Sequence, residues 1–193
     1  MRALDGIRLR LVPVTPRNAA QLWELLQQPG LRTYQDLPSV GLKAFCDIVA
    51  SRPSELTPKS AGRFEWMLAL PPGTEIAGWV SLRISHPETR GGEIGYSVLR
   101  QHRRKGIATE AVRVLLAEAF ETARLERVQA FCVPDNAASR NLLKRLGFVS
   151  DGVLPHGATV SGRPVDVLVH KLDREVWFQS GNTIEMPASA YPV

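Results

Sequence analysis

Three stretches of the chain carry the clearest patterns of hydrophobic and polar positions. From Glu93 to Leu99 polar or small residues alternate with apolar ones, which is the period of a strand with one buried face. Between Ala108 and Ala123 apolar residues recur every three or four positions, which predicts a long amphipathic helix. Arg127–Val133 is short and mostly apolar, which predicts a further strand. The sequence therefore predicts a strand, a helix and a second strand in that order.

The segments around this unit predict further elements. Ile7–Val12 predicts a strand, because Ile7, Leu9 and Leu11 alternate with arginines. Thr15 followed by Pro16 predicts the start of a helix, with Thr15 as the N-cap. The remaining predicted elements are, in order, a helix at 41–51, strands at 63–70 and 76–85, a helix from Pro134-Asp135-Asn136 to Leu146-Gly147, and strands at 152–160 and 165–172.

The length suits one domain. We find no internal repeat and no second domain in the 193 residues, so we expect a single domain over residues 1–178. The composition, 44% hydrophobic and 22% charged, is typical of a soluble globular protein. Residues 179–193 are polar with scattered Ala and Pro, and we expect them to form a flexible tail.

Several features favour a cytoplasmic protein that does not bind membranes. No apolar run approaches the roughly 18 residues that a membrane-spanning helix needs. The first residues contain no secretory hydrophobic core. The two cysteines, Cys46 and Cys132, are far apart in the sequence, so we expect buried free thiols rather than a disulfide framework.

A basic turn connects the first predicted strand to the long helix. Five of the seven residues from Arg100 to Gly106 are Arg, Lys or His. The N–H groups at a helix N-terminus, together with the positive end of the helix dipole, attract anions. Gly106 lets the backbone approach a ligand, and Ala108 is too small to block it. The junction therefore predicts a polyphosphate site, although the chain has neither a G-x-x-x-x-G-K-[ST] nor a G-x-G-x-x-G loop.

The formal net charge of +5 has two explanations. A basic protein can bind nucleic acid or the ribosome. Alternatively, the basic groups serve an anionic cofactor. We favour the second explanation and expect no nucleic-acid partner, because the sequence shows neither an RNA-recognition motif nor a stripe of aromatic and basic residues.

Two blocks of the sequence resemble one enzyme family. Arg103-x-x-Gly106-x-Ala108 matches the [QR]-x-x-G-x-[GA] signature of the GNAT superfamily of acetyl-CoA-dependent N-acetyltransferases. The wider run GYSVLRQHRRKGIATEA and the segment Asn136–Phe148 resemble the ribosomal-protein N-acetyltransferase (RimJ/RimL-type) branch. The resemblance implies an α/β (α+β) GNAT fold, with a mixed, twisted sheet of six or seven strands flanked by helices. It also implies that two central strands are splayed apart.

The same resemblance implies where acetyl-CoA binds. The backbone N–H groups of Val98 and Leu99 would polarise the thioester carbonyl. Asn136 would bind the pantetheine amides; a simple N-cap is the alternative, and the two roles can coexist. Ser139 would contact the cofactor or the departing thiolate. The pyrophosphate would lie on the segment formed by Arg103, Arg104, Lys105, Gly106, Ile107, Ala108 and Thr109.

Acetyl transfer also requires a neutral amine, and Glu93 is the candidate general base, acting through a water. Its alternative is a solvated or ion-paired glutamate. Many GNAT enzymes carry a tyrosine as general acid, and Leu143 stands at the matching position here, which leaves Ser139 or water. We expect direct transfer rather than an acyl-enzyme, because Cys132 lies in a predicted buried strand.

The sequence leaves the acceptor open. The resemblance favours a protein N-terminal α-amine, while a small-molecule amine and a catalytically silent CoA-binding module are the alternatives. It implies that the loop at Leu31–Pro38 forms part of the acceptor cleft, where Tyr34 either lines the cleft or simply packs. The four histidines lack ligand-like spacing, so we expect no metal, and we expect His102 to be exposed. Surface strands and the C-terminal segment could support a homodimer.

Overall fold

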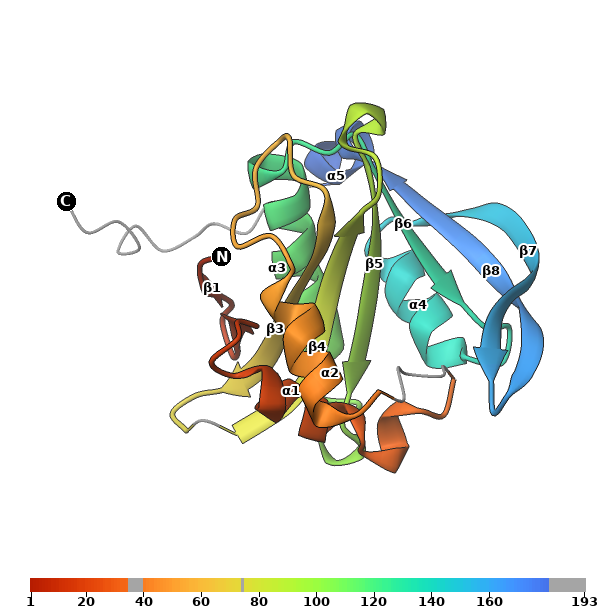
Figure 1. The fold of residues 1–193 in the computed structure, drawn as a ribbon. Coiled ribbons are helices and arrows are strands. Elements are labelled where there is room, and N and C mark those ends of the chain that lie inside the picture. Colours follow the sequence, from red (N-terminus) through yellow and green to blue (C-terminus); the bar gives the residue numbers. More distant parts are fainter. Residues whose placement is uncertain (35–39, 74, 181–193) are drawn as a thin grey trace.

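The computed structural model describes residues 1–34, 40–73 and 75–180, and in these residues one mixed sheet of eight strands organises the protein (Figure 1). The strand order is β1-β2-β3-β4-β5-β6-β8-β7. Among the described strands, β5 and β6 run parallel, and the other neighbours run antiparallel. The strands are β1 (Leu4–Asp5), β2 (Arg10–Pro13), β3 (Gly62–Leu70), β4 (Glu75–Ile84), β5 (Gly91–Val98), β6 (Arg127–Cys132), β7 (Val149–Val160) and β8 (Arg163–Asp173).

The sheet is mixed, as expected, but it has one strand more than the six or seven that the resemblance implied. The additional strand is β1, which pairs with β2 through Leu4 opposite Leu11. A turn connects the two strands of this hairpin, and the hydrogen bond from the Gly6 N–H to the Leu9 carbonyl (2.8 Å) closes the turn. Ile7 lies in the turn and is 90% exposed. The prediction of a strand beginning at Ile7 was therefore wrong, since a local reversal interrupts the alternating pattern.

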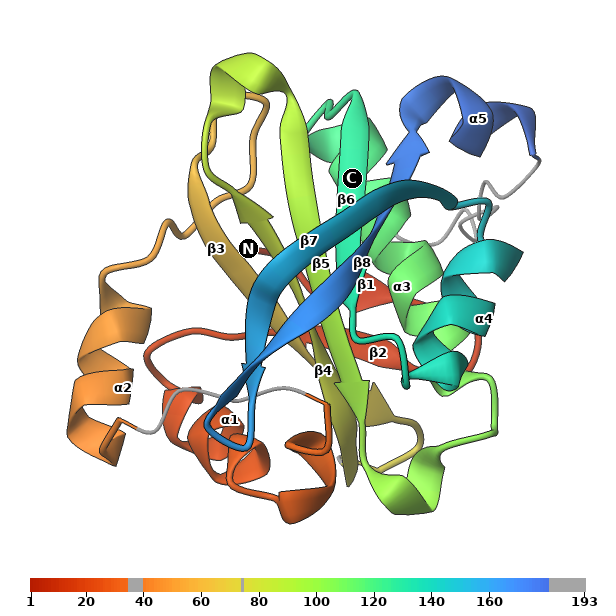
Figure 2. The same ribbon diagram turned by 90° about the vertical axis from the view of Figure 1, so that its right-hand side faces the viewer.

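Helices cover both faces of the sheet (Figures 1 and 2). On one face, α1 (Ala19–Leu26) and α2 (Leu42–Ala50) share a hydrophobic cluster with Met67 and Trp79. On the opposite face lie α3 (Ile107–Ala117) and α4 (Ala137–Arg145). The short α5 (Arg174–Gln179) follows β8. None of the helices within the described ranges has the length and apolarity needed to cross a membrane.

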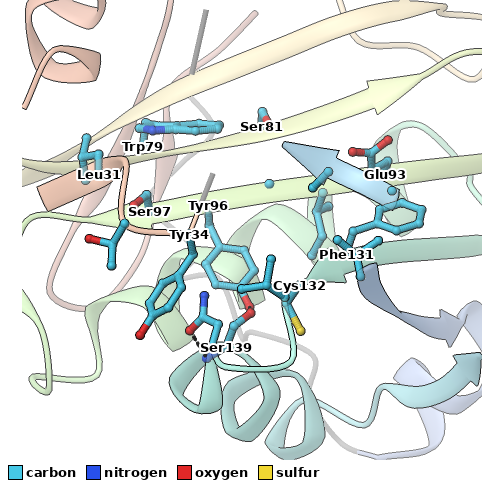
Figure 3. Close-up of a pocket in the computed structure, with 18 of the residues that line it drawn as sticks. Leu31, Tyr34, Trp79, Ser81, Glu93, Tyr96, Ser97, Phe131, Cys132 and Ser139 are labelled. Atoms are coloured by element: carbon cyan, nitrogen blue, oxygen red, sulfur yellow. Dashed lines mark hydrogen bonds between the residues drawn. The ribbon is translucent and has the colours of Figure 1, made fainter. Parts of the chain in front are cut away.

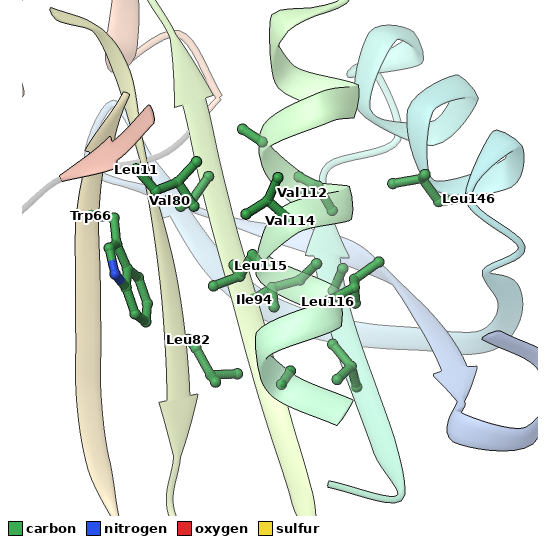
Figure 4. Close-up of a cluster of buried hydrophobic side chains, with 14 of the residues drawn as sticks. Leu11, Trp66, Val80, Leu82, Ile94, Val112, Val114, Leu115, Leu116 and Leu146 are labelled. Carbon is green, nitrogen blue, oxygen red and sulfur yellow. The ribbon is translucent and has the colours of Figure 1, made fainter. Parts of the chain in front are cut away.

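The larger hydrophobic core holds α3 against the middle of the sheet (Figure 4). Val112, Leu115 and Leu116 of α3 are fully buried and belong to one cluster with Val80 of β4 and Ile94 of β5. Burial of each such side chain stabilises the fold by roughly 1.5–3 kcal/mol. This packing fixes the position of α3, and therefore also the position of the basic loop that precedes it.

Two helix boundaries differ from the prediction. α1 begins at Ala19 with Asn18 as its N-cap, whereas the sequence predicted Thr15. The Thr15 N–H donates to Asn18 Oδ1 (2.7 Å) and the Asn18 N–H to the Thr15 carbonyl (3.1 Å), so residues 15–18 form a turn before the helix. The long helix predicted up to Ala123 is α-helical as far as Ala117 and continues as a π-helical turn, Glu118–Thr122.

Candidate active site

β5 and β6 separate part-way along their length. The two parallel strands pair only as far as Ile94 opposite Ala130. Beyond that point β5 continues to Val98 alongside β4, and β6 continues to Cys132 alongside β8. The sheet therefore opens into a V-shaped gap, which Figure 1 shows between the labels β5 and β6. This confirms the expected splay of the central strands.

The edge of β5 that faces away from β4 borders this gap. The Leu99 N–H donates to the Ala77 carbonyl (2.8 Å) and so belongs to the ladder with β4. Because backbone groups of successive residues point to opposite sides of a strand, the N–H groups of Tyr96 and Val98 point toward the gap. The Val98 carbonyl accepts a hydrogen bond from Arg103 Nε (2.9 Å). Of the two predicted thioester donors, the Val98 N–H is therefore suitably directed, and the Leu99 N–H is already engaged.

The N-terminus of α3 is shaped for an anion. Gly106 is its N-cap and has φ 78°, a left-handed conformation that few other residues adopt. The Glu110 N–H donates to the Gly106 carbonyl (3.1 Å), so the N–H groups of Ile107, Ala108 and Thr109 come before the first helical hydrogen bond. These amides stand at the positive end of the helix dipole. The segment thus has the donors that the predicted pyrophosphate site needs.

Arg8 connects the loop before α3 to the first turn of that helix. Its Nη1 donates to the Lys105 carbonyl (3.0 Å), and its Nε lies 2.9 Å from Glu110 Oε2. A Cβ added at Gly106 would come within 2.8 Å of Arg8 Nη2, so a side chain there would displace the end of the Arg8 side chain. The role of Arg8 could not be predicted from the sequence, because the residues that Arg8 contacts lie about a hundred positions away along the chain.

α4 begins on the other side of the gap. Asn136 is its N-cap and accepts a hydrogen bond from the Ser139 N–H through Oδ1 (3.1 Å), which confirms the capping role. The Ser139 hydroxyl lies 2.8 Å from the Tyr96 hydroxyl, so a hydrogen bond joins β5 to α4 across the gap (Figure 3). Leu143, at the position of the family's usual tyrosine, is fully buried in the core.

Tyr96 is the functional candidate that sequence reasoning missed. Its apolar ring fitted the alternation of β5, and its partner Ser139 lies 43 positions away. Burial raises the pKa of the Tyr96 phenol well above its ordinary value, and the hydrogen bond with Ser139 offsets only part of this effect. Tyr96 therefore keeps its proton at neutral pH and is able to donate to the Ser139 oxygen.

A cavity of about 480 Å³ occupies the gap and extends onto the face that carries α1 and α2. Glu93 and Phe131 lie together at one end of it, while Tyr96, Cys132 and Ser139 lie deeper, near the start of α4 (Figure 3). Tyr34 also lines the cavity, as one of its two interpretations required. Residues 35–38 of the same loop lie outside the described residues.

The cavity brings some of the predicted site residues together and leaves others outside. Glu93, Asn136, Ser139 and Arg103 all line it. Residues 104–109 do not contribute to its walls and instead form the loop and the first turn of α3. The predicted site residues therefore fall into two groups, one lining the cavity and one at the N-terminus of α3.

Arg103 has two structural partners. Besides Val98, its guanidinium contacts the Gly30 carbonyl through Nη2 (2.5 Å). It therefore joins the end of β5 to the 3₁₀ turn Pro29–Leu31, which ends three residues before Tyr34. A side chain held in this way shapes the cavity wall, and its backbone remains part of the signature loop.

Glu93 is exposed at the mouth of the cavity. Its carboxylate forms no ion pair with any residue that the structure describes, so the ion-paired alternative does not apply. Gly95 follows on the same face, and a Cβ there would lie 2.9 Å from Ser81 Oγ. The absence of a side chain at Gly95 leaves a depression in the sheet between Glu93 and the open end of the gap.

Cys132 and His102 are both buried. Cys132 is a buried free thiol, and burial raises its pKa, which favours the unreactive protonated form. The prediction that His102 is exposed was wrong. It is 6% exposed, and its Nε2 lies 3.1 Å from Glu75 Oε1, because a 3₁₀ turn folds it back toward the start of β4. Among the described residues, no group of three or more His, Cys, Asp and Glu is placed to hold a metal ion.

Comparison with known families identifies this arrangement. The acetyltransferase (GNAT) domain matches residues 8–149 of the chain. The chain belongs to the GNAT acetyltransferase family. The N-acetyltransferase p20 of Bacillus licheniformis is 28% identical to this GNAT protein over 173 residues, which are 89% of this chain and 96% of p20. The N-acetyltransferase YoaA of Bacillus subtilis is 32% identical over 98 residues, 51% of this chain, so the chain spans 55% of that relative.

Relatives from the ribosomal-protein branch confirm the resemblance to RimJ/RimL-type enzymes. The ribosomal-protein-serine acetyltransferase of Escherichia coli is 30% identical over 80 residues, which are 42% of this chain and 45% of that enzyme. RimJ of Mycobacterium smegmatis, solved in complex with CoA-disulfide, superimposes with a TM-score of 0.73 at 22% identity and covers 94% of this chain and 95% of that chain. The ribosomal-protein-S5-alanine acetyltransferase of Vibrio fischeri gives 0.76 at 20% identity, with 92% and 99% covered. These structures confirm the GNAT fold.

Proposed function

We propose that this GNAT protein transfers the acetyl group of acetyl-CoA to an amine, and that the amine is the N-terminal α-amine of a protein. The observation that carries the proposal is the gap between β5 and β6. It has Glu93 at its mouth and the hydrogen-bonded Tyr96 and Ser139 deeper inside. A base on one side and a hydroxyl donor on the other are the groups that acyl transfer from a thioester requires.

The residues present suit acetyl-CoA. The N–H groups of Ile107, Ala108 and Thr109, with Arg104 and Lys105 beside them, would hold the pyrophosphate. The cavity of about 480 Å³ has room for the acetyl group and part of the pantetheine arm. When bound, acetyl-CoA supplies an acetyl group in a thioester, whose thiolate is a good leaving group because its conjugate thiol has a pKa of about 8.5.

The acceptor must lose a proton before it can attack. An α-amine with a pKa near ~7.8 is roughly 14% neutral at pH 7, whereas a lysine amine near ~10.4 is roughly 0.04% neutral. An α-amine therefore depends less than a lysine on help from a base such as Glu93. Glu93 accepts the ammonium proton through a water, and the nitrogen lone pair then forms the C–N bond.

The opposite wall stabilises the charge that moves to oxygen and sulfur. The Val98 N–H, which points away from β4, would donate to the developing oxyanion. As the C–S bond breaks, the Ser139 hydroxyl donates to the sulfur. Tyr96 acts as a positioning residue, because its own proton bonds Ser139 Oγ and turns the Ser139 proton toward the cavity. The attacking nitrogen loses its second proton to solvent as the amide forms, and the departing thiolate takes a proton from solvent.

A screen of acceptors tests this proposal. Thiol release from acetyl-CoA is measured with peptides that have free N-termini, with the same peptides N-blocked but carrying a lysine, and with polyamines. We expect turnover with free N-termini and little with blocked peptides. Turnover with polyamines alone would identify a small-molecule acetyltransferase. Tight CoA binding without turnover would identify a catalytically silent module, and either result would contradict the proposal.

The cellular setting belongs to the same proposal. We place the protein in the cytoplasm, where free thiols such as Cys46 and Cys132 persist and new protein N-termini arise.

We also propose a homodimer. β7 is an edge strand with exposed Val149, Val153 and Leu154, and such an edge can pair with a second copy. Light scattering of the purified protein decides between a dimer and a monomer.

A further inference from the structure

Three residues form a row across the centre of the sheet, on the face that carries α1 and α2 but beyond the area that these helices cover. Arg83 of β4 lies opposite Glu93 of β5, and Glu93 lies opposite Gln129 of β6. Residues that face each other across an antiparallel pair such as β4 and β5 have Cβ atoms about 4.5–5.5 Å apart. Arg83 and Glu93 are both exposed. A cation therefore stands directly beside the proposed general base.

The row lies where two cavities meet. The cavity of the gap, about 480 Å³, and a second one of about 510 Å³ along the same face share three lining residues, which are Arg83, Glu93 and Phe131. The second cavity continues past Gln129 and Arg127 toward the far end of β5. A substrate whose amine reaches the gap beside Glu93 would extend past Arg83 into the second cavity.

Most cations of these cavities already have a partner. Arg63 Nε lies 2.8 Å from Glu65 Oε1, and Arg127 Nε lies 2.5 Å from Asp173 Oδ1. Arg103 is held by two backbone carbonyls.

Arg83 differs from the other cations. Within residues 1–34, 40–73 and 75–180 it forms no ion pair and no side-chain hydrogen bond, and neither does its neighbour Glu93. Two opposite charges therefore stand side by side at the junction of the cavities, each without a protein partner in the described part of the chain.

We infer that Arg83 selects acceptors that carry a carboxylate close to the amine that is acetylated. The inference rests on the proposed function, since it assigns the amine to the gap beside Glu93. Arg83 then presents its guanidinium to a carboxylate of the same molecule, and a guanidinium can form two parallel hydrogen bonds with a carboxylate. The carboxylate belongs either to an acidic side chain near the N-terminus of a peptide, as the proposed function requires, or to a free amino acid, which would make the acceptor a small-molecule amine.

The test compares pairs of acceptors that differ only in this charge. One pair is a peptide with Asp at its second position and the same peptide with Asn. The other is a free amino acid and its amide. We expect the wild-type protein to prefer the carboxylate member of at least one pair. We expect Arg83→Gln to lower kcat/KM for that member by roughly tenfold to a hundredfold while changing its neutral partner less than about threefold.

Two further variants sharpen the result. Arg127→Gln removes the same charge from the second cavity, but Asp173 already pairs with Arg127, so we expect no change in the preference. Arg83→Glu should reverse the preference in favour of neutral acceptors. Because charged groups at an exposed site are screened by salt, the wild-type preference should also shrink as ionic strength rises.

Three outcomes decide the question. A loss confined to the carboxylate acceptors supports the inference, and the pair that shows it identifies the source of the carboxylate. Equal losses for charged and neutral acceptors, or a wild-type protein with no preference, would overturn it and leave the proposed function standing. If no amine in either pair releases thiol from acetyl-CoA, the proposed function itself is overturned and the inference with it.

Discussion

Replacing Tyr96 with Phe tests the link between β5 and α4. The change removes one hydroxyl, and with it the 2.8 Å hydrogen bond to Ser139, but keeps the ring that fills the gap. A neutral hydrogen bond contributes about 0.5–1.5 kcal/mol. If this energy orients the Ser139 proton in the transition state, kcat should fall about threefold to tenfold with little change in the KM for acetyl-CoA.

The same variant has a second readout that depends on pH. The folded state keeps the Tyr96 phenol neutral, because its pKa is raised by burial, whereas the unfolded chain ionises it above about pH 10. The folded state then binds more protons than the unfolded state, so stability is lost as the pH rises. Above pH ~10 the wild-type protein should lose up to about 1.4 kcal/mol of unfolding free energy per pH unit relative to the Phe variant.

Urea denaturation at pH 7 and at pH 9–11, with steady-state kinetics at pH 7, measures both effects. Ser139→Ala is the matched control, because it breaks the same hydrogen bond but keeps the buried phenol. It should lower kcat while retaining the wild-type loss of stability at high pH. An unchanged kcat in both variants would refute a role for the pair in catalysis. Parallel stability curves for Tyr96→Phe and the wild type would refute the buried neutral phenol.

Three other substitutions examine the remaining parts of the site. Glu93→Gln should lower kcat/KM roughly tenfold to a hundredfold at pH 7 and much less near pH 9, where the amine is already neutral; a constant deficit across this range would exclude Glu93 as the base. Gly106→Ala would place an alanine in the left-handed conformation, at a cost of about 1–2 kcal/mol, with its Cβ 2.8 Å from Arg8 Nη2. The variant should therefore bind acetyl-CoA more weakly in calorimetry. Gly41→Ala, where nothing lies within 4 Å of the added Cβ, is its control, and equal binding by the two variants would count against the loop. Arg103→Ala removes the bonds to Val98 and Gly30 and should lower the free energy of unfolding by about 1–3 kcal/mol, which a denaturation curve coincident with the wild type would contradict.

Local periodicity was sufficient to predict the parts of the fold that hold the site. β5, α3, β6 and α4 all follow from patterns within a few residues, because a buried face imposes the period of its own element. The start of α3 at Gly106 was predictable for the same reason, since the helix start and its glycine are adjacent in the sequence. The two wrong predictions, a strand beginning at Ile7 and a helix N-cap at Thr15, also have local causes. In both places the residues form a turn instead of the regular element that their pattern predicted.

Contacts between distant segments were beyond such reasoning. The burial of His102 depends on the position of Glu75, and the loss of the Leu99 donor depends on the register of β5 against β4. The bond between Tyr96 and Ser139, like that between Arg8 and Lys105, requires the complete topology of the sheet. No pattern within one element specifies these distances, which follow from the way the sheet brings β4, β5 and α4 together.

An NMR titration of the protein with acetyl-CoA, followed through its backbone amide signals, tests the central claim most directly. If the cofactor lies between β5 and β6 with its pyrophosphate on α3, the amide signals of Val98, Ile107, Ala108, Thr109 and Ser139 should shift together and saturate with one dissociation constant. If those signals stay in place while others move, or if millimolar acetyl-CoA moves none, the gap is not the cofactor site.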